Sequence, residues 1–130
     1  MGKWRVDTTT RPGVLRLSLD GRVTVEEMTA FVDAHSRAID AYAGGDYKVW
    51  CDISKMQTLD QDCVLLFEKA KQYSNAHPNF RGSAVLVASA VVAMQHRRTS
   101  VGGGVMSTEL ISEDAVALEL HLRTVYRRSE

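Results

Sequence analysis

The 130 residues include 16 basic and 16 acidic side chains, so the formal net charge at pH 7 is zero. A chain without net charge has no global field to attract nucleic acid or an anionic membrane, which argues against both as partners. With 45% hydrophobic and 25% charged residues, the composition is that of an ordinary soluble domain. We therefore expect a single domain over residues 1–130, long enough to close one core.

Targeting signals and metal motifs are not evident in the sequence. The N-terminal segment lacks the apolar core of a signal peptide, and no later stretch reaches the roughly 18 apolar residues of a membrane span. We therefore expect a cytoplasmic protein without a stable membrane anchor. Cys51 and Cys63 do not have the spacing of a zinc site, and each lies in an apolar pattern. We interpret both as reduced core residues. A disulfide between them is the alternative, and it requires their Cα atoms to lie roughly 4.4–6.8 Å apart.

The first half of the chain predicts a hairpin, a helix and a strand. Alternating polarity predicts strands at 4–9 and 13–19, joined by turn-forming residues. Thr24 is a predicted N-cap, and apolar residues at helical spacing predict a helix from 25 to 42 that Gly44 and Gly45 end. The histidine on this stripe, His35, is expected to be a packed or boundary residue. A near-continuous apolar run then predicts a central strand at 46–53.

The second half continues the alternation. A helix capped near Asp60 is predicted to run to about Asn75, and the least polar run of the chain, 83–88, predicts a buried strand. Ser89 or Ala90 starts a short third helix that the glycines at 102–104 end. A fifth strand at 105–111 leads to Ser112, the predicted N-cap of a last helix. The apolar stripe of that helix is Ala115, Leu118, Leu122 and Val125, and Arg123, Arg127 and Arg128 lie near its end.

This order, ββαβαβαβα, predicts an α/β fold: a single mostly parallel sheet of about five strands with an N-terminal antiparallel hairpin and about four helices. In open α/β sheets, ligands and partners bind at the loops that leave the carboxyl ends of the strands. The segment 49–62 is therefore the most informative one, because it joins the predicted central strand to the second helix through a polar loop.

The element order and two short motifs resemble the STAS and SpoIIAA-like family, including its small bacterial members grouped with Sec14-like sequences. The family pattern is a strand ending in Asp-Leu-Ser, followed by Asp-Ser-Ser-Gly at the next helix. Asp52-Ile53-Ser54 fits the first part, and Asp60-Gln61-Asp62-Cys63 stands in place of the second. In anti-sigma factor antagonists of this family the second Ser of that motif is phosphorylated, and its counterpart here is Asp62. A carboxylate cannot serve as that serine phosphorylation switch, but it presents a permanent negative charge.

The resemblance implies a non-catalytic protein-interaction or signalling module whose partner-binding residues include Ser54, Asp60 and Asp62. The expected partner is a protein. It can be a second copy of the chain, because an exposed hairpin edge can pair with another such edge to form a homo-oligomer. Ser54 is the remaining hydroxyl of the loop and is either a turn residue or a modification site. The acidic residues near the second helix are better explained by capping than by a metal ion.

Catalytic motifs are weak throughout. The sequence has no Gly-x-Ser-x-Gly elbow, and its glycine run follows a helix instead of opening one as a phosphate loop does. We therefore expect no enzyme, cofactor or metal. His96, Arg97 and Arg98 form the one local positive patch, a candidate contact for an anion or an acidic partner, although a solvated helix face explains it better. The alternative function is a small apolar-ligand binding domain, favoured by the chain's adaptable methionines and opposed by the little volume available for a pocket.

Overall fold

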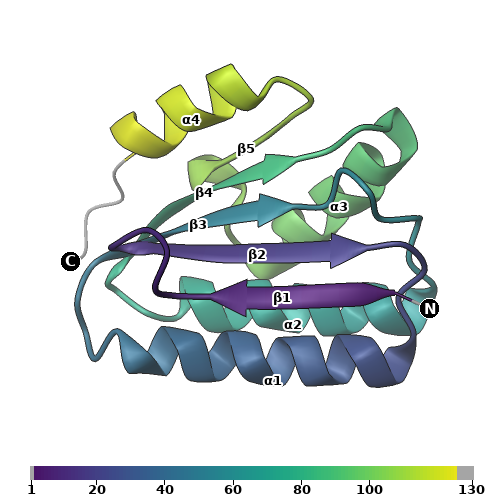
Figure 1. The fold of residues 1–130 in the computed structure, drawn as a ribbon, viewed down its shortest axis with the longest axis horizontal. Coiled ribbons are helices and arrows are strands. Elements are labelled where there is room, and N and C mark those ends of the chain that lie inside the picture. Colours follow the sequence, from purple (N-terminus) through teal and green to yellow (C-terminus); the bar gives the residue numbers. More distant parts are fainter. Residues whose placement is uncertain (1, 126–130) are drawn as a thin grey trace.

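The computed structural model describes residues 2–125 and shows one sheet flanked by helices (Figure 1). Its elements are β1 (Lys3–Asp7), β2 (Val14–Asp20), α1 (Val25–Ala41), β3 (Tyr47–Asp52), α2 (Gln61–Asn75), β4 (Phe80–Leu86), α3 (Ala90–Gly103), the 3-10 helix η1 (Met106–Thr108), β5 (Glu109–Ser112) and α4 (Ala115–Thr124). The predicted fold class is confirmed, with five strands and four α-helices in the described part of the chain.

The strands lie in the order β1-β2-β3-β4-β5, with β1 antiparallel to β2 and every other pair parallel. Each crossover steps to the next strand in the same direction, and right-handed crossovers of this kind place their helices on one face. Accordingly, α1, α2 and α3 cover one face, and α4 turns back over the other (Figure 1). Because the strand order never reverses, the sheet has no switch-point crevice of the type that usually holds a ligand.

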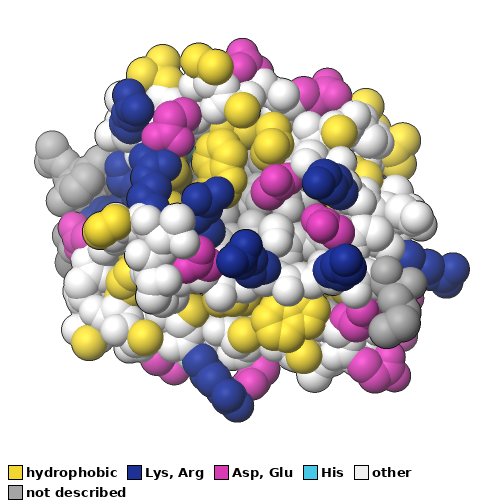
Figure 2. Space-filling view, in the orientation of Figure 1, with side chains coloured by type: hydrophobic (Ala, Val, Ile, Leu, Met, Phe, Trp, Pro, Cys, Tyr) yellow, Lys and Arg dark blue, Asp and Glu magenta, His cyan; other side chains and the backbone are white. Residues whose placement is uncertain are grey.

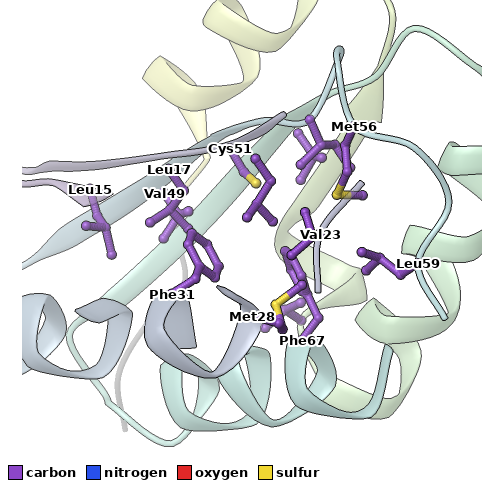
Figure 3. Packing of buried hydrophobic residues seen from close by; sticks show 14 of the residues in the cluster. Leu15, Leu17, Val23, Met28, Phe31, Val49, Cys51, Met56, Leu59 and Phe67 are labelled. Atoms are coloured by element: carbon purple, nitrogen blue, oxygen red, sulfur yellow. The ribbon is translucent and has the colours of Figure 1, made fainter. Parts of the chain in front are cut away.

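The main core lies between the sheet and the three helices α1–α3. Alternate strand residues point into it, among them Leu15, Leu17, Val49 and Cys51, and meet Phe31 and other side chains of the helices (Figure 3). A second, smaller cluster lies beneath α4 and consists of Val14, Ala84, Leu118 and Leu122. The sheet is therefore buried on both faces only where α4 covers it. Beside α4, the sheet face carries interspersed acidic and basic side chains (Figure 2).

Three predicted helix starts are confirmed. Thr24 caps α1 in a capping box with Glu27, whose carboxylate accepts from the Thr24 N–H at 2.9 Å. Asp60 caps α2 by accepting from the Cys63 N–H at 3.0 Å, and Ser89 caps α3. Together these caps fix the points at which the chain leaves each loop for a helix.

Three boundaries differ from the prediction. The first helix ends at Ala41, before the glycine pair, because Tyr42 already serves as its C-cap. Ser112 is not the cap of α4: the Asp114 carboxylate accepts from the N–H groups of Val116 and Ala117, and Ser112 accepts from the Asp114 N–H. The fifth strand begins only at Glu109, because residues 106–108 form a 3-10 turn.

The glycine run at 102–104 also differs. Gly102 and Gly103 belong to the last turn of α3, and only Gly104, in the left-handed conformation at φ 77°, ends the helix. A side chain at Gly103 would overlap the Cβ of Lys71 on α2. This glycine therefore allows α2 and α3 to approach closely. Arg127 and Arg128, predicted near the end of α4, lie outside the described residues.

No helix among residues 2–125 combines the length and the apolar character needed to cross a membrane. Both cysteines are free and buried, as predicted. Burial raises the pKa of the Cys51 thiol to about 12 and that of Cys63 to about 11. Both thiols are therefore protonated near neutral pH and behave as small core residues.

Candidate functional site

Residues 54–62 form the loop that leaves the carboxyl end of β3 and the first residues of α2, and they are attached to their surroundings on two sides. On one side, Gly21 donates from its N–H to the carbonyl of Lys55 at 2.8 Å and accepts from the Gln57 N–H at 2.9 Å. On the other side, the Gln95 side chain of α3 forms two hydrogen bonds of 2.7 Å with the backbone of Leu59. The loop is thereby held in one conformation between β2 and α3.

The side chains of this loop divide into buried anchors and exposed polar groups. Met56 and Leu59 are buried in the main core, whereas Gln57, Thr58 and the residues at the start of α2 are exposed. An open hollow of about 310 Å³ lies beside the loop; its lining includes Arg22, Gln57 and Asp60. The loop thus presents a polar surface above two buried apolar side chains.

The three residues predicted to bind a partner have different environments. The Ser54 hydroxyl donates to the Asp52 carboxylate at 2.6 Å, so it is already engaged within the loop. Asp60 is the α2 cap, and the backbone N–H of Cys63 lowers the pKa of its carboxyl group. Asp62 lies exposed in the first turn of α2 and makes no ion pair with residues 2–125. Only Asp62 therefore presents an uncommitted charge to solvent.

The start of α3 extends this surface. Gln95 brings the helix against the loop, and Val91, one turn earlier, is exposed together with Met94. Exposed apolar side chains beside a polar rim are typical of protein-binding surfaces. We refer to residues 54–62 together with Val91 and Met94 as the edge surface.

The predicted positive patch is wrong in one residue. Arg97 and Arg98 are exposed on α3, but His96 is buried, with 3% of its surface accessible. Successive helical residues point in different directions, and His96 is the one that turns inward. The exposed charge of this helix face therefore comes from the two arginines alone.

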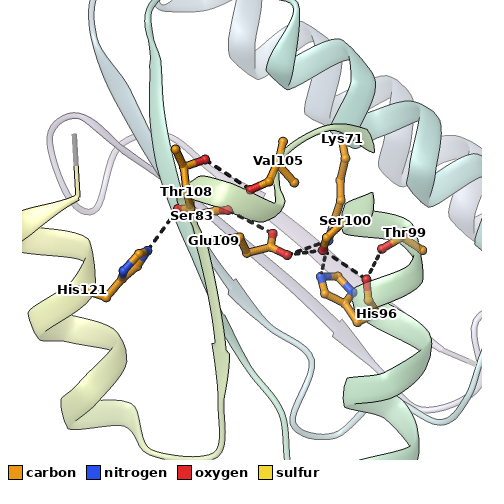
Figure 4. Close-up of polar contacts among 9 residues, drawn as sticks. All are labelled: Lys71, Ser83, His96, Thr99, Ser100, Val105, Thr108, Glu109 and His121. Carbon is orange, nitrogen blue, oxygen red and sulfur yellow. Dashed lines mark hydrogen bonds and ion pairs between the residues drawn. The ribbon is translucent and has the colours of Figure 1, made fainter. Parts of the chain in front are cut away.

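His96 instead belongs to a buried polar cluster formed by Lys71, Ser83, His96, Ser100 and Glu109 (Figure 4). The Lys71 Nζ donates to Glu109 Oε1 at 3.0 Å and to Ser100 Oγ at 2.5 Å, and lies 2.7 Å from Nε2 of His96. The other carboxylate oxygen of Glu109 accepts from Ser83 at 3.0 Å, and Ser100 also donates to Glu109. Side chains from α2, α3, β4 and β5 are thus joined in one network.

The electrostatics of the buried polar cluster follow from its depth. Burial lowers the pKa of His96, and the nearby Lys71 ammonium lowers it further. The imidazole is therefore neutral, and its Nε2 accepts a hydrogen bond from Lys71. Burial also lowers the pKa of Lys71, while the Glu109 carboxylate opposes that shift. With the side chains of Lys71 and Glu109 only 9% and 4% exposed, the two form an ion pair shielded from water.

A cavity of about 30 Å³ adjoins the buried polar cluster. Among its lining residues is His35, whose ring is buried, as predicted, and whose Nδ1 has no hydrogen-bond partner among the described residues. Burial lowers the pKa of His35 to about 4, and the nearby His77 adds to this shift. The cavity is far smaller than the roughly 300 Å³ of an ordinary ligand pocket.

The buried polar cluster was not predicted, although the spacing of its residues in the sequence offers a signal. Lys71 follows Phe67 by four residues and so lies on the buried stripe of α2, and Ser100 follows His96 by four. Polar residues on an apolar stripe, in two neighbouring helices, would have indicated a shared network. Among residues 2–125, His, Cys, Asp and Glu side chains are nowhere grouped in threes that could hold a metal ion.

Comparisons with known proteins identify the fold. The chain matches no family model and no curated protein. Among solved structures it is similar to an uncharacterized protein from the DUF3478 family with a SpoIIAA-like fold from Shewanella loihica PV-4, with a TM-score of 0.64 and 13% sequence identity over 93% of each chain. The protein therefore has a SpoIIAA-like fold, as the sequence motifs indicated. At 13% identity the similarity concerns the fold alone.

Proposed function

We propose that the protein is a non-catalytic module that binds a protein partner through the edge surface. The observation that carries the proposal is the attachment of residues 54–62 on two sides, by Gly21 and by Gln95. A loop held in one conformation loses little entropy on binding, so its exposed groups can serve recognition efficiently. The exposed Val91 and Met94 supply apolar contact area next to the uncommitted charge of Asp62.

Two features favour a binding role over catalysis. The Ser54 hydroxyl is hydrogen-bonded to Asp52, and the two thiols are buried and protonated. The lysine and histidine of the buried polar cluster use their polar atoms within the core, away from a substrate. The alternative, an apolar-ligand binding domain, has less support because the interior cavity measures about 30 Å³.

A site-specific crosslinking experiment tests the proposal. A photoreactive residue placed at Thr58 or Met94, in cells that make the protein naturally, should capture one discrete partner. The same photoreactive residue placed at position 37 serves as the control, because Arg37 is exposed on α1 and is not part of the edge surface. Equal capture from all three positions would refute the edge surface as the binding site.

The role of Asp62 is then measured with the purified partner. Asp62→Ser should weaken binding by about ten- to hundredfold if the carboxylate contacts the partner, because a lost charged hydrogen bond costs about 1.5–3 kcal/mol. Its melting temperature should stay close to that of the parent, since Asp62 is not the cap of α2. Unchanged affinity would remove Asp62 from the recognition surface.

A further inference from the structure

The outer face of α4 is the most exposed apolar feature of the described chain. Val116 is 79% exposed and Leu120 is 64% exposed, more than any other large hydrophobic residue among residues 2–125. They lie one turn apart on the same side of the helix, opposite Leu118 and Leu122, which face the sheet. Apolar side chains also appear along the top of the molecule, where α4 lies (Figures 1 and 2). No element among residues 2–125 covers this face.

Charges of opposite sign flank the two apolar residues. Glu113 is exposed just before the helix, and Arg123 lies in its last turn. Arg123 is 71% exposed and pairs with Glu119 at 3.4 Å, but Glu119 is already engaged by Arg11 through two hydrogen bonds of 2.6 and 2.9 Å. Arg123 therefore retains donors for another carboxylate.

The order of these four residues is self-complementary. Positions 113 and 123 lie symmetrically about position 118, and so do positions 116 and 120. If a second α4 lies antiparallel across the first with a two-fold axis at this midpoint, Val116 meets Leu120 of the second copy, and Glu113 approaches Arg123 of that copy. A two-fold interface requires this kind of self-complementarity, in which each contact occurs twice.

We propose that a second copy of this chain docks on the protein through α4, in an antiparallel two-fold arrangement. A ten-residue helix is only about 15 Å long, so the contact is smaller than the roughly 800 Å² per partner of a standard stable interface. The dimer is accordingly weak and forms with rising concentration.

This geometry has a consequence for the edge surface. The α3 part of the edge surface lies on the sheet face opposite to α4, so dimerisation through α4 leaves it exposed (Figure 1). A dimer would then present two copies of the edge surface and could bind a two-site partner with increased avidity. The dimer itself does not depend on the proposed partner binding, and the two are tested separately.

Sedimentation velocity of the purified full chain, from about 10 µM to about 1 mM, tests the dimer. The parent should shift from monomer towards dimer, and Leu120→Lys should weaken association by about tenfold or more, as expected for an apolar anchor at the centre of an interface. Val101→Lys is the matched control, because Val101 is 60% exposed on α3 and belongs neither to the edge surface nor to the α4 contact. A parent that stays monomeric, or a Leu120→Lys variant that associates like the parent, overturns the proposal.

A charge exchange tests the orientation. Arg123→Glu should weaken the dimer, because it places two carboxylates opposite each other at both ends of the contact. Adding Glu113→Arg should restore association, since the exchanged pair is again complementary. Circular dichroism should confirm that both variants keep the helical content of the parent. A double variant that associates no better than Arg123→Glu alone would overturn the antiparallel arrangement.

Discussion

Replacing Lys71 with Met should destabilise the protein strongly, although methionine preserves most of the apolar stem of the side chain. The substitution removes the ammonium group and leaves the Glu109 carboxylate buried, with the hydroxyls of Ser83 and Ser100 as its remaining side-chain partners among residues 2–125. Breaking one side of a buried ion pair costs about 3–5 kcal/mol. The buried polar cluster is almost fully shielded, so we expect the cost to fall within that range.

The double variant Lys71→Met with Glu109→Gln should recover most of this loss. Glutamine removes the uncompensated charge, yet its carbonyl oxygen can still accept from Ser83 or Ser100. A neutral replacement of a buried ion pair is often close to neutral in stability, so the double variant should lie within about 1–2 kcal/mol of the parent. The two substitutions are therefore expected to be strongly non-additive.

Urea unfolding at pH 7, followed by far-UV circular dichroism, measures these effects. With a urea dependence of about 2 kcal/mol per molar, Lys71→Met should lower the midpoint by about 2 M. Lys69→Met, at an exposed position of the same helix, is the control and should stay within about 0.5 kcal/mol of the parent. A loss below about 1 kcal/mol for Lys71→Met, or a double variant that loses the sum of both singles, would refute the ion-pair interpretation.

Two further predictions concern residues around the buried polar cluster. Burial lowers the pKa of His35 to about 4. Between pH 6.5 and 4 the unfolded chain therefore binds a proton at His35 that the folded chain does not. The free energy of unfolding should accordingly decrease by about 1.4 kcal/mol per pH unit as the pH falls from 6.5 towards 4. His35→Leu should flatten this part of the stability curve in urea titrations at each pH, and an unchanged slope would contradict the assignment. Gly103→Ala should destabilise the protein by about 1–3 kcal/mol in the same assay, because the new Cβ would overlap that of Lys71. An ordinary helical Gly→Ala change stabilises instead. A gain in stability would show that α2 and α3 can separate without cost.

The hydrophobic pattern was sufficient to predict the architecture because sequence period and burial are directly related. Alternation in β2 buries Leu15, Leu17 and Leu19 on one side, and helical spacing in α1 buries Phe31 and Ile39. Since each crossover returns to the next strand, element order alone then limits the sheet to few topologies. Three of the four described helix starts were predictable for the same local reason, because a cap needs only one side chain and a backbone N–H two or three residues later.

The predictions failed where the outcome depends on a neighbouring element. At residues 102–104 the sequence shows only flexible backbone, whereas in the structure α3 continues through Gly103, where a side chain would overlap Lys71 of α2. His96 looked like part of a charged patch because it precedes two arginines. Its inward direction follows from the rotation of α3, which is set by the packing of Val92, Ala93 and Thr99 against the core.

The buried polar cluster and the glycine at the end of α3 belong to the same structural solution. An ion pair in a core stabilises a protein little by itself, because desolvation offsets most of the attraction. It does, however, disfavour any packing in which the two charges are separated. Here the charges come from α2 and β5, while the Ser100 hydroxyl and the His96 imidazole come from α3. Gly103 removes the side chain that would keep α3 away from Lys71. The network can therefore form only when α3 lies at this distance from α2, and Gln95 on the same helix then reaches the backbone of Leu59. In this way the packing of the core determines the position of the edge surface.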